Sequence, residues 1–377
     1  MPALSELIAT PVATRCALHG ATDQASFKRG VVSGTTVRYL HFDRPDWTLS
    51  NTLDWLGDNA SLLEETVDGC GGVLLRELPG LYNQSHFDAV IGQLAPPDDK
   101  RKEKRKEKDK DKPAGTGCMA ARSAFMQPSE APAGWSVAAH QELAHLKSAP
   151  DRVALFFEQP ASRGGETTLC DMRKVLPFMP MSLLAEADHV GLQLRRAFPS
   201  AATAHLKPDF HGSWQDLFGT ADADVVEQIV DNNGWHCRWR DEGQTLQLWQ
   251  DVVAPTQEHP GTGESVWRNA AHHYSPLCMM AGALEDGRVA DYELLAHARR
   301  HTPHVLDTLV LGNDEALDES DCLHARRVLK QAEVSVPARK GDLLILDNLH
   351  YGHGRRAYRG ERRVLHSHYA RQAGVVA

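Results

Sequence analysis

The chain has 377 residues, of which 42% are hydrophobic and 24% are charged, and its formal net charge is −9 at pH 7. A chain of this length and composition can bury a large core, and its acidic balance argues against a nucleic-acid-binding surface. No apolar run approaches the ~18 residues of a membrane helix, and the N-terminal stretch lacks a secretory signal pattern. We therefore expect a cytoplasmic protein that binds neither nucleic acid nor membrane.

Helix and strand signals alternate in the N-terminal part. Ser61, with Glu64 three residues later, is the capping-box pattern of a helix that runs to about Asp68. A short apolar run at 73–78 follows two glycines and predicts a buried strand. A second helix is expected to be capped by Asn83 or Ser85, because apolar residues then recur at helical spacing.

A highly charged segment, 97–113, interrupts the chain after this helix. Residues 101–112 alone carry eight Lys/Arg against four Asp/Glu and no apolar residue. Such a segment cannot contribute to a core, so we predict a solvated, disordered insertion. An electrostatic arm that binds a carrier protein or a polyanion is the alternative interpretation.

Strand patterns dominate the remainder. Predicted strands cover 135–139, 153–158, 167–172, 237–240, 245–250 and 343–346, with another beginning at 362, and predicted helices cover 222–230, 291–300 and 321–333. The last helix is expected to be capped by Ser320. Strands in two distant blocks predict a mainly β fold with peripheral helices (α+β), a double-stranded β-helix or jelly roll, as a single domain over 1–377.

The cysteines carry no signal of a metal or disulfide site. All seven are scattered along the chain, and none forms a CxxC pair. An odd number without local pairing predicts reduced, buried thiols.

Three residues form a candidate metal site. In a strand, His140 and Glu142 point to the same face. A second imidazole can come from a different strand, and the candidate is His353, which follows a predicted strand and lies in a glycine-punctuated loop. Two histidines and one carboxylate on one face of a metal leave open positions, which suits iron(II), although manganese and zinc also take such ligands. Alone, His-x-Glu is a weak signal, because the chain has 20 histidines and 50 acidic residues.

The order of several motifs strengthens this interpretation. Along the chain these are W-x4-HQEL, FFEQPASRGGETTLCDMR, VWRNAAHHY and GDLLILDN-x4-HGR-x6-RRV. Their order resembles the TauD/TfdA superfamily of iron(II)- and 2-oxoglutarate-dependent dioxygenases, especially its amino-acid hydroxylases related to clavaminate synthase and to the syringomycin and asparagine hydroxylases. The likeness runs from about Leu53 to the C-terminus. It implies a jelly-roll oxidoreductase that uses Fe(II), 2-oxoglutarate and O2.

The resemblance also assigns roles to single residues. It makes His140, Glu142 and His353 the iron ligands, and it places the Thr167 hydroxyl on the far carboxylate of 2-oxoglutarate. The charged partner of that carboxylate is expected to be an arginine, because a guanidinium binds a carboxylate through two parallel hydrogen bonds. The resemblance favours Arg363, with Arg362 as the second choice. Adjacent residues of a strand face opposite ways, so only one of the two arginines can enter the fold.

Four further residues are candidates for substrate contacts. Arg122 precedes the His140 strand, and Asn269 and His273 lie in VWRNAAHHY, where at most one of two adjacent histidines can line a pocket. Ser367 stands where the resemblance to taurine dioxygenase expects an arginine for the sulfonate. Taurine itself is therefore not expected as the substrate.

These expectations define a reaction and its alternatives. The resemblance implies hydroxylation of an unactivated C–H bond in a small molecule, an amino acid or a derivative that is free or tethered to a carrier protein, in natural-product or antibiotic biosynthesis. We expect a lid at about 175–235 to shield the site from water. The same site could instead carry out desaturation, epoxidation or catabolic C–X cleavage. A jelly-roll binding module without catalysis is the alternative outside enzymes, and the intact ligand set counts against it.

Overall fold

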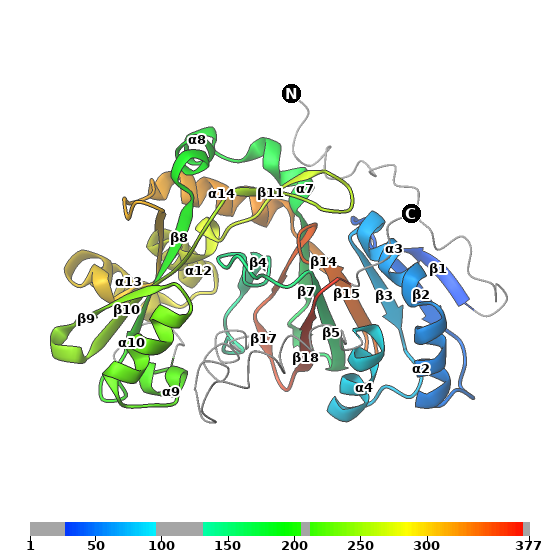
Figure 1. Ribbon diagram of the computed structural model, residues 1–377. Coiled ribbons are helices and arrows are strands. Elements are labelled where there is room, and N and C mark those ends of the chain that lie inside the picture. Colours follow the sequence, from blue (N-terminus) through cyan, green and yellow to red (C-terminus); the bar gives the residue numbers. More distant parts are fainter. Residues whose placement is uncertain (1–26, 96–130, 205–211, 372–377) are drawn as a thin grey trace.

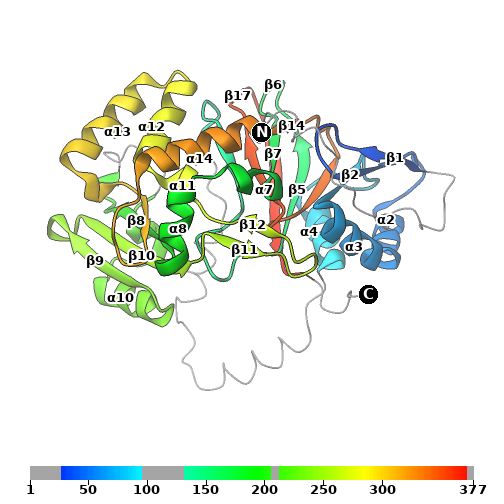
Figure 2. The ribbon, with the colours of Figure 1, turned by 90° about the horizontal axis from the view of Figure 1, so that it is seen from above.

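The computed structural model describes residues 27–95, 131–204 and 212–371 (Figure 1). The charged insertion at 97–113 and Arg122 lie outside the described residues. Two facing β-sheets occupy the middle of the molecule, with helices on both outer sides and a separate lobe built on another sheet (Figures 1 and 2).

The larger central sheet has six strands that come from both ends of the chain. In order across the sheet they are β1 (Phe27–Val31), β2 (Arg38–Phe42), β3 (Gly72–Arg76), β15 (Leu343–Asp347), β5 (Arg152–Gln159) and β18 (Arg363–Tyr369). All neighbours pair antiparallel except β2 and β3, which are parallel. The sheet thus brings the last strand of the chain beside β5.

The smaller central sheet has four strands and faces the larger one. These are β14 (Val334–Val336), β7 (Thr167–Asp171), β16 (Tyr351–Arg355) and β4 (Val137–His140). Side chains alternate along β5, so that Val153, Leu155 and Phe157 pack between the sheets against Leu169 and Tyr351. Two facing sheets with peripheral helices confirm the predicted fold class, although they do not close into a barrel within the described part of the chain.

Three helices cover the outer face of the larger sheet. They are α2 (Leu49–Asp58), α3 (Ala60–Cys70) and α4 (Gln84–Leu94), and they pack on the opposite side chains of β5 and β15. The expected cap of α3 at Ser61 is wrong, because the helix begins after Asn59 and Glu64 is buried against Arg152 instead. The cap of α4 is as predicted, since the Asn83 side chain accepts a hydrogen bond of 3.1 Å from the backbone N–H of His86.

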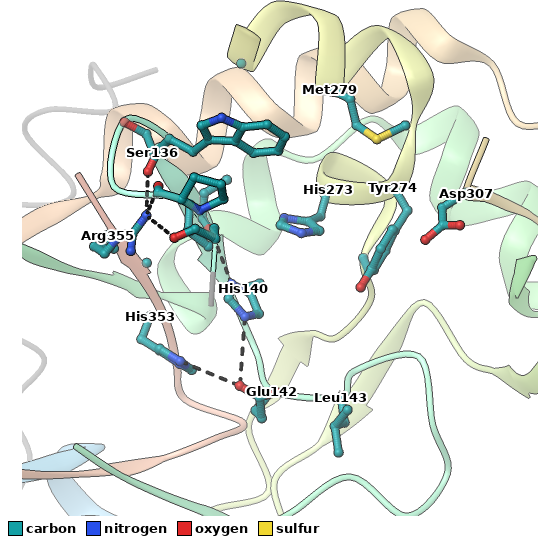
Figure 3. Close-up of a pocket in the computed structure, with 18 of the residues that line it drawn as sticks. Ser136, His140, Glu142, Leu143, His273, Tyr274, Met279, Asp307, His353 and Arg355 are labelled. Carbon is teal, nitrogen blue, oxygen red and sulfur yellow. Dashed lines mark hydrogen bonds and ion pairs between the residues drawn. The ribbon is translucent and has the colours of Figure 1, made fainter. Parts of the chain in front are cut away.

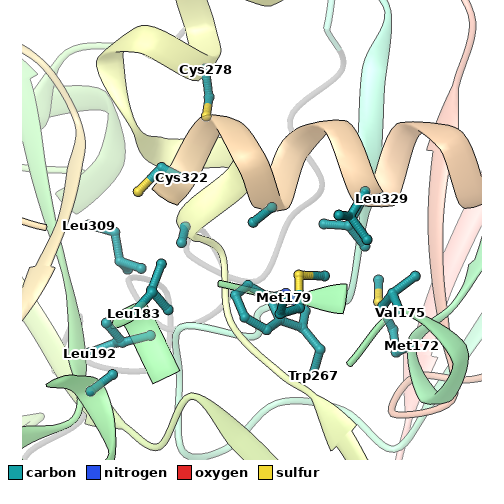
Figure 4. Close-up of a cluster of buried hydrophobic side chains, with 14 of the residues drawn as sticks. Met172, Val175, Met179, Leu183, Leu192, Trp267, Cys278, Leu309, Cys322 and Leu329 are labelled. Atoms are coloured by element: carbon teal, nitrogen blue, oxygen red, sulfur yellow. The ribbon is translucent and has the colours of Figure 1, made fainter. Parts of the chain in front are cut away.

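A second group of helices covers the outer face of the smaller sheet (Figure 4). It comprises α7 (Met172–Val175), α8 (Met181–Val190), α11 (Ala271–Tyr274), α12 (Pro276–Glu285) and α14 (Glu319–Ala332). Trp267, fully buried, lies at the centre of this cluster. The cap of α14 is Asp318 and not Ser320 as expected, because the carboxylate of Asp318 accepts a 2.7 Å hydrogen bond from the Ser320 N–H.

The separate lobe carries a four-stranded antiparallel sheet. Its strands are β13 (Thr308–Leu311), β8 (Leu192–Pro199), β10 (Thr245–Val253) and β9 (His236–Arg240), and its helices are α9 (Trp214–Phe218), α10 (Ala223–Asn232) and, beside α12, α13 (Val289–His301). The predicted strands at 237–240 and 245–250 pair as β9 and β10, and the predicted helix at 222–230 is α10, so these predictions are confirmed. The segment 175–235 supplies α8, β8, α9 and α10, and its role as a lid stays a prediction.

Short elements complete the fold. They are β6 (Arg163–Gly164), β17 (Tyr358–Arg359), β11 (Thr256–Glu258), β12 (Ser265–Trp267) and the 3-10 helices Leu176–Phe178, Asp241–Gly243 and Pro303–Val305. None of the described helices combines the length and the apolar character that crossing a bilayer requires.

The described cysteines are free thiols, as predicted. Cys70, Cys170, Cys278 and Cys322 are buried, and Cys237 is half-buried. Burial raises the pKa of Cys278 to about 11 and that of Cys322 to about 12. These thiols therefore stay protonated at neutral pH and act as apolar packing groups.

Candidate metal centre and cavity

The structure places His140 and His353 opposite one another on neighbouring strands. β4 and β16 pair antiparallel with His140 against His353, and the centres of the two rings are 5.0 Å apart. His353 thus lies on a strand and not in the loop that the sequence suggested. The neighbouring Gly354 allows this close pairing, because a Cβ there would meet the Val137 carbonyl oxygen at 2.5 Å.

Glu142 reaches the same point from a turn. β4 ends at His140, so strand alternation does not position the carboxylate as expected. The turn is held by Asn348, whose side chain accepts a 2.7 Å hydrogen bond from the Glu142 N–H and donates one of 2.9 Å to the Glu142 carbonyl. Leu143 follows with φ of 54°, a left-handed conformation that reverses the chain. Asn348 is therefore a positioning residue for the candidate metal ligand.

The three side chains converge on one oxygen atom (Figure 3). The Nε2 atoms of His140 and His353 lie 3.9 Å and 3.7 Å from Oε2 of Glu142. The Nδ1 atom of His140 lies 2.9 Å from the Ala138 carbonyl oxygen, which holds the proton on Nδ1 and leaves the Nε2 lone pair toward Glu142. The three ligand atoms all lie within 4.8 Å of one another.

This donor set fits a metal ion. Burial lowers the pKa of His353 well below its usual value, so its imidazole is neutral and able to bind a metal. Among the described residues, the ion-pair partners of the Glu142 carboxylate are all imidazoles, and no arginine or lysine neutralises it. Two imidazoles and one carboxylate on one side are the facial arrangement that iron(II) oxygenases use.

An arginine and a threonine meet on the neighbouring wall of the same cavity. Thr167 is buried at the start of β7, and Arg362 donates from Nε to the Gly165 carbonyl at 3.1 Å and from an outer nitrogen to the Thr167 hydroxyl at 3.4 Å. Gly165 has φ of +73°, which turns the chain between β6 and β7 as the paired glycines suggested. Both side chains line the cavity beside His353.

Arg363, the first choice for the 2-oxoglutarate carboxylate, points away from this wall. Its side chain is 61% exposed and pairs with Glu158 at 2.7 Å. Arg362, which directly precedes β18, lines the cavity, whereas Arg363, the first residue of that strand, does not. The choice of Arg363 is thus corrected to Arg362.

One of the two adjacent histidines faces the cavity. His273 lines it, with its ring 5.3 Å from that of His140 (Figure 3). His272 turns away, and its Nε2 lies 2.9 Å from the Ala139 carbonyl oxygen. Burial lowers the pKa of His272 to about 3, as suits a neutral imidazole that holds β4 in place.

Two of the other predicted substrate contacts, Asn269 and Ser367, are not on the cavity wall. Asn269 is buried among backbone groups, donating to the Pro255 carbonyl at 2.9 Å and accepting from the Ala271 N–H at 3.0 Å, so its role is structural. Ser367 lies on the face of β18 opposite to His366 and is not a lining residue. Arg122 lies outside the described residues.

The cavity extends well beyond the three metal-binding side chains. Its volume is about 950 Å³, and the separate lobe supplies much of the wall opposite His353. There Arg196 donates from Nε to Asp307 at 3.3 Å and stacks over Phe198, and all three residues line the cavity. Sequence reasoning missed Arg196, Asp307 and the inward His366, because they carry no motif and only the packing of the lobe brings the first two to the site.

A second group of metal-capable side chains lies where β15 ends. His259, Asp347 and His350 are buried, and their ligand atoms also lie within 4.8 Å of one another. Two guanidinium groups already occupy this group. Arg152 donates to Asp347 Oδ2 at 2.6 Å, and an outer nitrogen of Arg371 lies 2.9 Å from His259 Nε2.

We call these five residues the arginine-closed cluster. Burial opposes ionisation of Asp347, but the hydrogen bond from His259 and the charge of Arg152 hold the pKa of its carboxyl well below the usual range. A metal ion would have to displace Arg152 and Arg371 from the atoms that it needs. The cluster is therefore an internal ion-pair network and not a metal site.

The fold and the donor set together fit the class of site that iron(II)- and 2-oxoglutarate-dependent oxygenases use. Residues 36–369 match the family model described as taurine catabolism dioxygenase TauD, TfdA family. The match covers most of the chain, so the protein belongs to the TauD/TfdA family. Members of this family are oxidoreductases that use Fe(II), 2-oxoglutarate and O2, and the donor set described above fits such an iron site.

Two curated relatives show what the chain is similar to. It is 30% identical over 242 residues to the dapdiamide synthesis protein DdaC of Enterobacter agglomerans, a match that covers 63% of this chain and 66% of DdaC. It is 25% identical over 248 residues to a clavaminate synthase-like protein of Arabidopsis thaliana, again with 63% and 66% covered. The matched region thus spans slightly less than two thirds of each relative.

Solved structures are more distant. PvcB from Pseudomonas aeruginosa is 14% identical, with a TM-score of 0.47 and 93% of each chain covered. A likeness at this level says nothing about the substrate.

Proposed function

We propose that His140, Glu142 and His353 bind Fe(II), and that the enzyme hydroxylates an unactivated C–H bond of an amino acid or an amino-acid-derived small molecule. The observation that carries the proposal is the convergence of two imidazole nitrogens on a carboxylate that no arginine or lysine of the described residues neutralises, at the wall of a large cavity. With iron bound, O2 would supply one oxygen atom to the substrate and the other to 2-oxoglutarate, which would become succinate and carbon dioxide.

Arg362 and Thr167 would hold the far carboxylate of 2-oxoglutarate. The Arg362 guanidinium is already aimed along the wall by its hydrogen bond to the Gly165 carbonyl, and the Thr167 hydroxyl lies within 3.4 Å of it. A guanidinium fork and a hydroxyl can together satisfy both oxygens of a carboxylate. Leu155 and Val364 line the cavity beside them and keep this wall apolar.

The far wall supports a substrate that carries charge. Arg196 and Asp307 present opposite charges in a region where they are only 11% and 1% exposed, which suits the ionic groups of an amino acid. The segment 175–235 contributes Arg196, Phe198 and Leu217 to this wall and would act as the lid that excludes water. The similarity to a protein of dapdiamide synthesis favours a biosynthetic role, with the substrate free or presented on a carrier protein.

A succinate-formation screen tests the proposal. The purified protein, loaded anaerobically with Fe(II), would be mixed with 2-oxoglutarate, air and a panel of amino acids, both free and tethered to carrier proteins. We expect succinate only with a subset of the panel, and a product that has gained one oxygen atom. The His353→Ala protein is the control and should form none.

The product separates the alternatives. A loss of two hydrogen atoms would indicate desaturation, and cleavage of a C–X bond would indicate a catabolic enzyme. A wild-type protein that binds no Fe(II) while folded would contradict the ligand assignment and favour a binding module.

A further inference from the structure

His368 is a buried histidine beside the candidate metal centre. It lies on β18 two residues after His366, on the inner face of the strand, and its side chain is only 9% exposed. Its Nε2 atom is buried and has no hydrogen-bond partner among the described residues. Buried polar nitrogens in folded proteins almost always have a partner, so a group near Nε2 that can accept or donate a hydrogen bond is expected.

The nearest charged group is the carboxylate of Glu142. His368 Nε2 lies 3.8 Å from Glu142 Oε2, the same oxygen that His140 and His353 approach. This distance exceeds a hydrogen bond by only ~0.6–1 Å, which a small rotation of either side chain removes. A carboxylate oxygen has two lone pairs, so it can bind a metal and accept a hydrogen bond at once.

His368 is not placed as a ligand itself. The atoms that lie within 4.8 Å of one another belong to His140, Glu142 and His353, and His368 is not among them. With metal–nitrogen bonds of about 2.1 Å, two ligand atoms of one ion can be no more than ~4.2 Å apart. Nε2 of His368 therefore approaches the Glu142 carboxylate without being one of the ligand atoms.

We propose that His368 is a positioning residue for the metal centre, and that its Nε2–H donates a hydrogen bond to the Glu142 carboxylate. The inference rests on the proposed ligand set. The hydrogen bond orients the carboxylate toward the ion and satisfies the buried imidazole. Outer partners of this kind typically change metal affinity by ~10–100-fold.

Titration of the metal-free protein with Co(II), followed by visible absorption, tests the proposal without turnover. His368→Leu removes the N–H, and we expect Co(II) affinity to fall ~10-fold or more. His368→Gln keeps an N–H donor at similar reach and should recover most of the affinity. His297→Leu makes the same change at an exposed position of α13 and should bind Co(II) like the wild type.

The outcomes separate this inference from the proposed function. Equal Co(II) affinity in the wild type and His368→Leu would overturn it, as would a His368→Gln protein that binds as weakly as His368→Leu. If the leucine variant does not fold, His368→Phe, which keeps a ring without the donor, takes its place. A wild-type protein that binds no Co(II), like His140→Ala, would contradict the ligand set itself.

Discussion

Two clusters of the same side-chain types, one including His353 of β16 and the other including Asp347 of β15, differ in their charge partners. The metal centre has His140, Glu142 and His353, and the arginine-closed cluster has His259, Asp347 and His350. In the first, the ion-pair partners of the carboxylate among the described residues are imidazoles, and the carboxylate lines a cavity. In the second, the carboxylate is buried against Arg152.

The difference shows that ligand spacing alone does not define a metal site. A carboxylate that is already paired with a guanidinium has little to gain from a metal ion, because displacing the arginine would leave a buried charge unpaired. A carboxylate without such a partner is costly to bury, unless a metal ion supplies the missing charge. Access acts in the same direction, since the first cluster lines a large cavity.

The largest expected effect is on metal binding. His140→Ala and His353→Ala should each weaken Fe(II) or Co(II) binding by more than ~100-fold, beyond the range known for outer partners. His259→Ala should leave one metal per chain with unchanged affinity. Equilibrium dialysis with metal analysis measures both. If the wild type bound two metal ions per chain and His259→Ala bound one, the second cluster would be a metal site and the comparison would fail.

The arginine-closed cluster should instead determine stability. Arg152 is fully buried and pairs with Glu64, Asp68 and Asp347, so Arg152→Leu leaves buried carboxylates unpaired and should cost about 3–5 kcal/mol. Urea denaturation of the metal-free protein measures the change. Arg299→Leu, which removes an ion pair at a more exposed site, is the control and should cost less than ~1 kcal/mol.

The effect on 2-oxoglutarate binding at the wall formed by Arg362 and Thr167 is expected to be smaller. The residue next to Arg362 provides a matched control. Arg362→Leu should weaken 2-oxoglutarate binding by ~10–100-fold, which corresponds to the loss of one charged hydrogen-bonding group. Arg363→Leu should leave it nearly unchanged, because that side chain pairs with Glu158 at the surface. Calorimetric titration of the metal-loaded, oxygen-free protein compares the two, and the reverse ranking would restore the original choice of Arg363.

The smallest effect concerns acid stability. Burial lowers the pKa of His350 in the arginine-closed cluster to about 3, whereas an unfolded histidine titrates near ~6.5. The unfolded state therefore binds more protons between these values, and the free energy of unfolding falls as pH drops below ~6.5, by at most ~1.4 kcal/mol per pH unit. In His350→Gln this slope should be shallower. Urea denaturation from pH 7 to pH 5 measures the slope, and parallel curves for the two proteins would contradict the prediction.

Local patterns predicted the elements better than their ends. The helices and strands came from periodicity, which one segment contains by itself. The caps at Ser61 and Ser320 were wrong, because Asn59 and Asp318 compete for the same helix starts and Glu64 has a stronger partner in Arg152. Competition of this kind depends on neighbours that are distant in sequence.

The amino-acid sequence by itself determined the two-sheet fold class and the residues His140, Glu142, His353 and Thr167 as candidates, because these stand in motifs of recognisable order. Only the tertiary structure decided which side chains face the cavity. The inward turn of Arg362 and the exclusion of Asn269 and Ser367 follow from strand register and packing. A shift of one residue along a strand reverses every side chain, and that register is set by pairing across the sheet rather than along the chain.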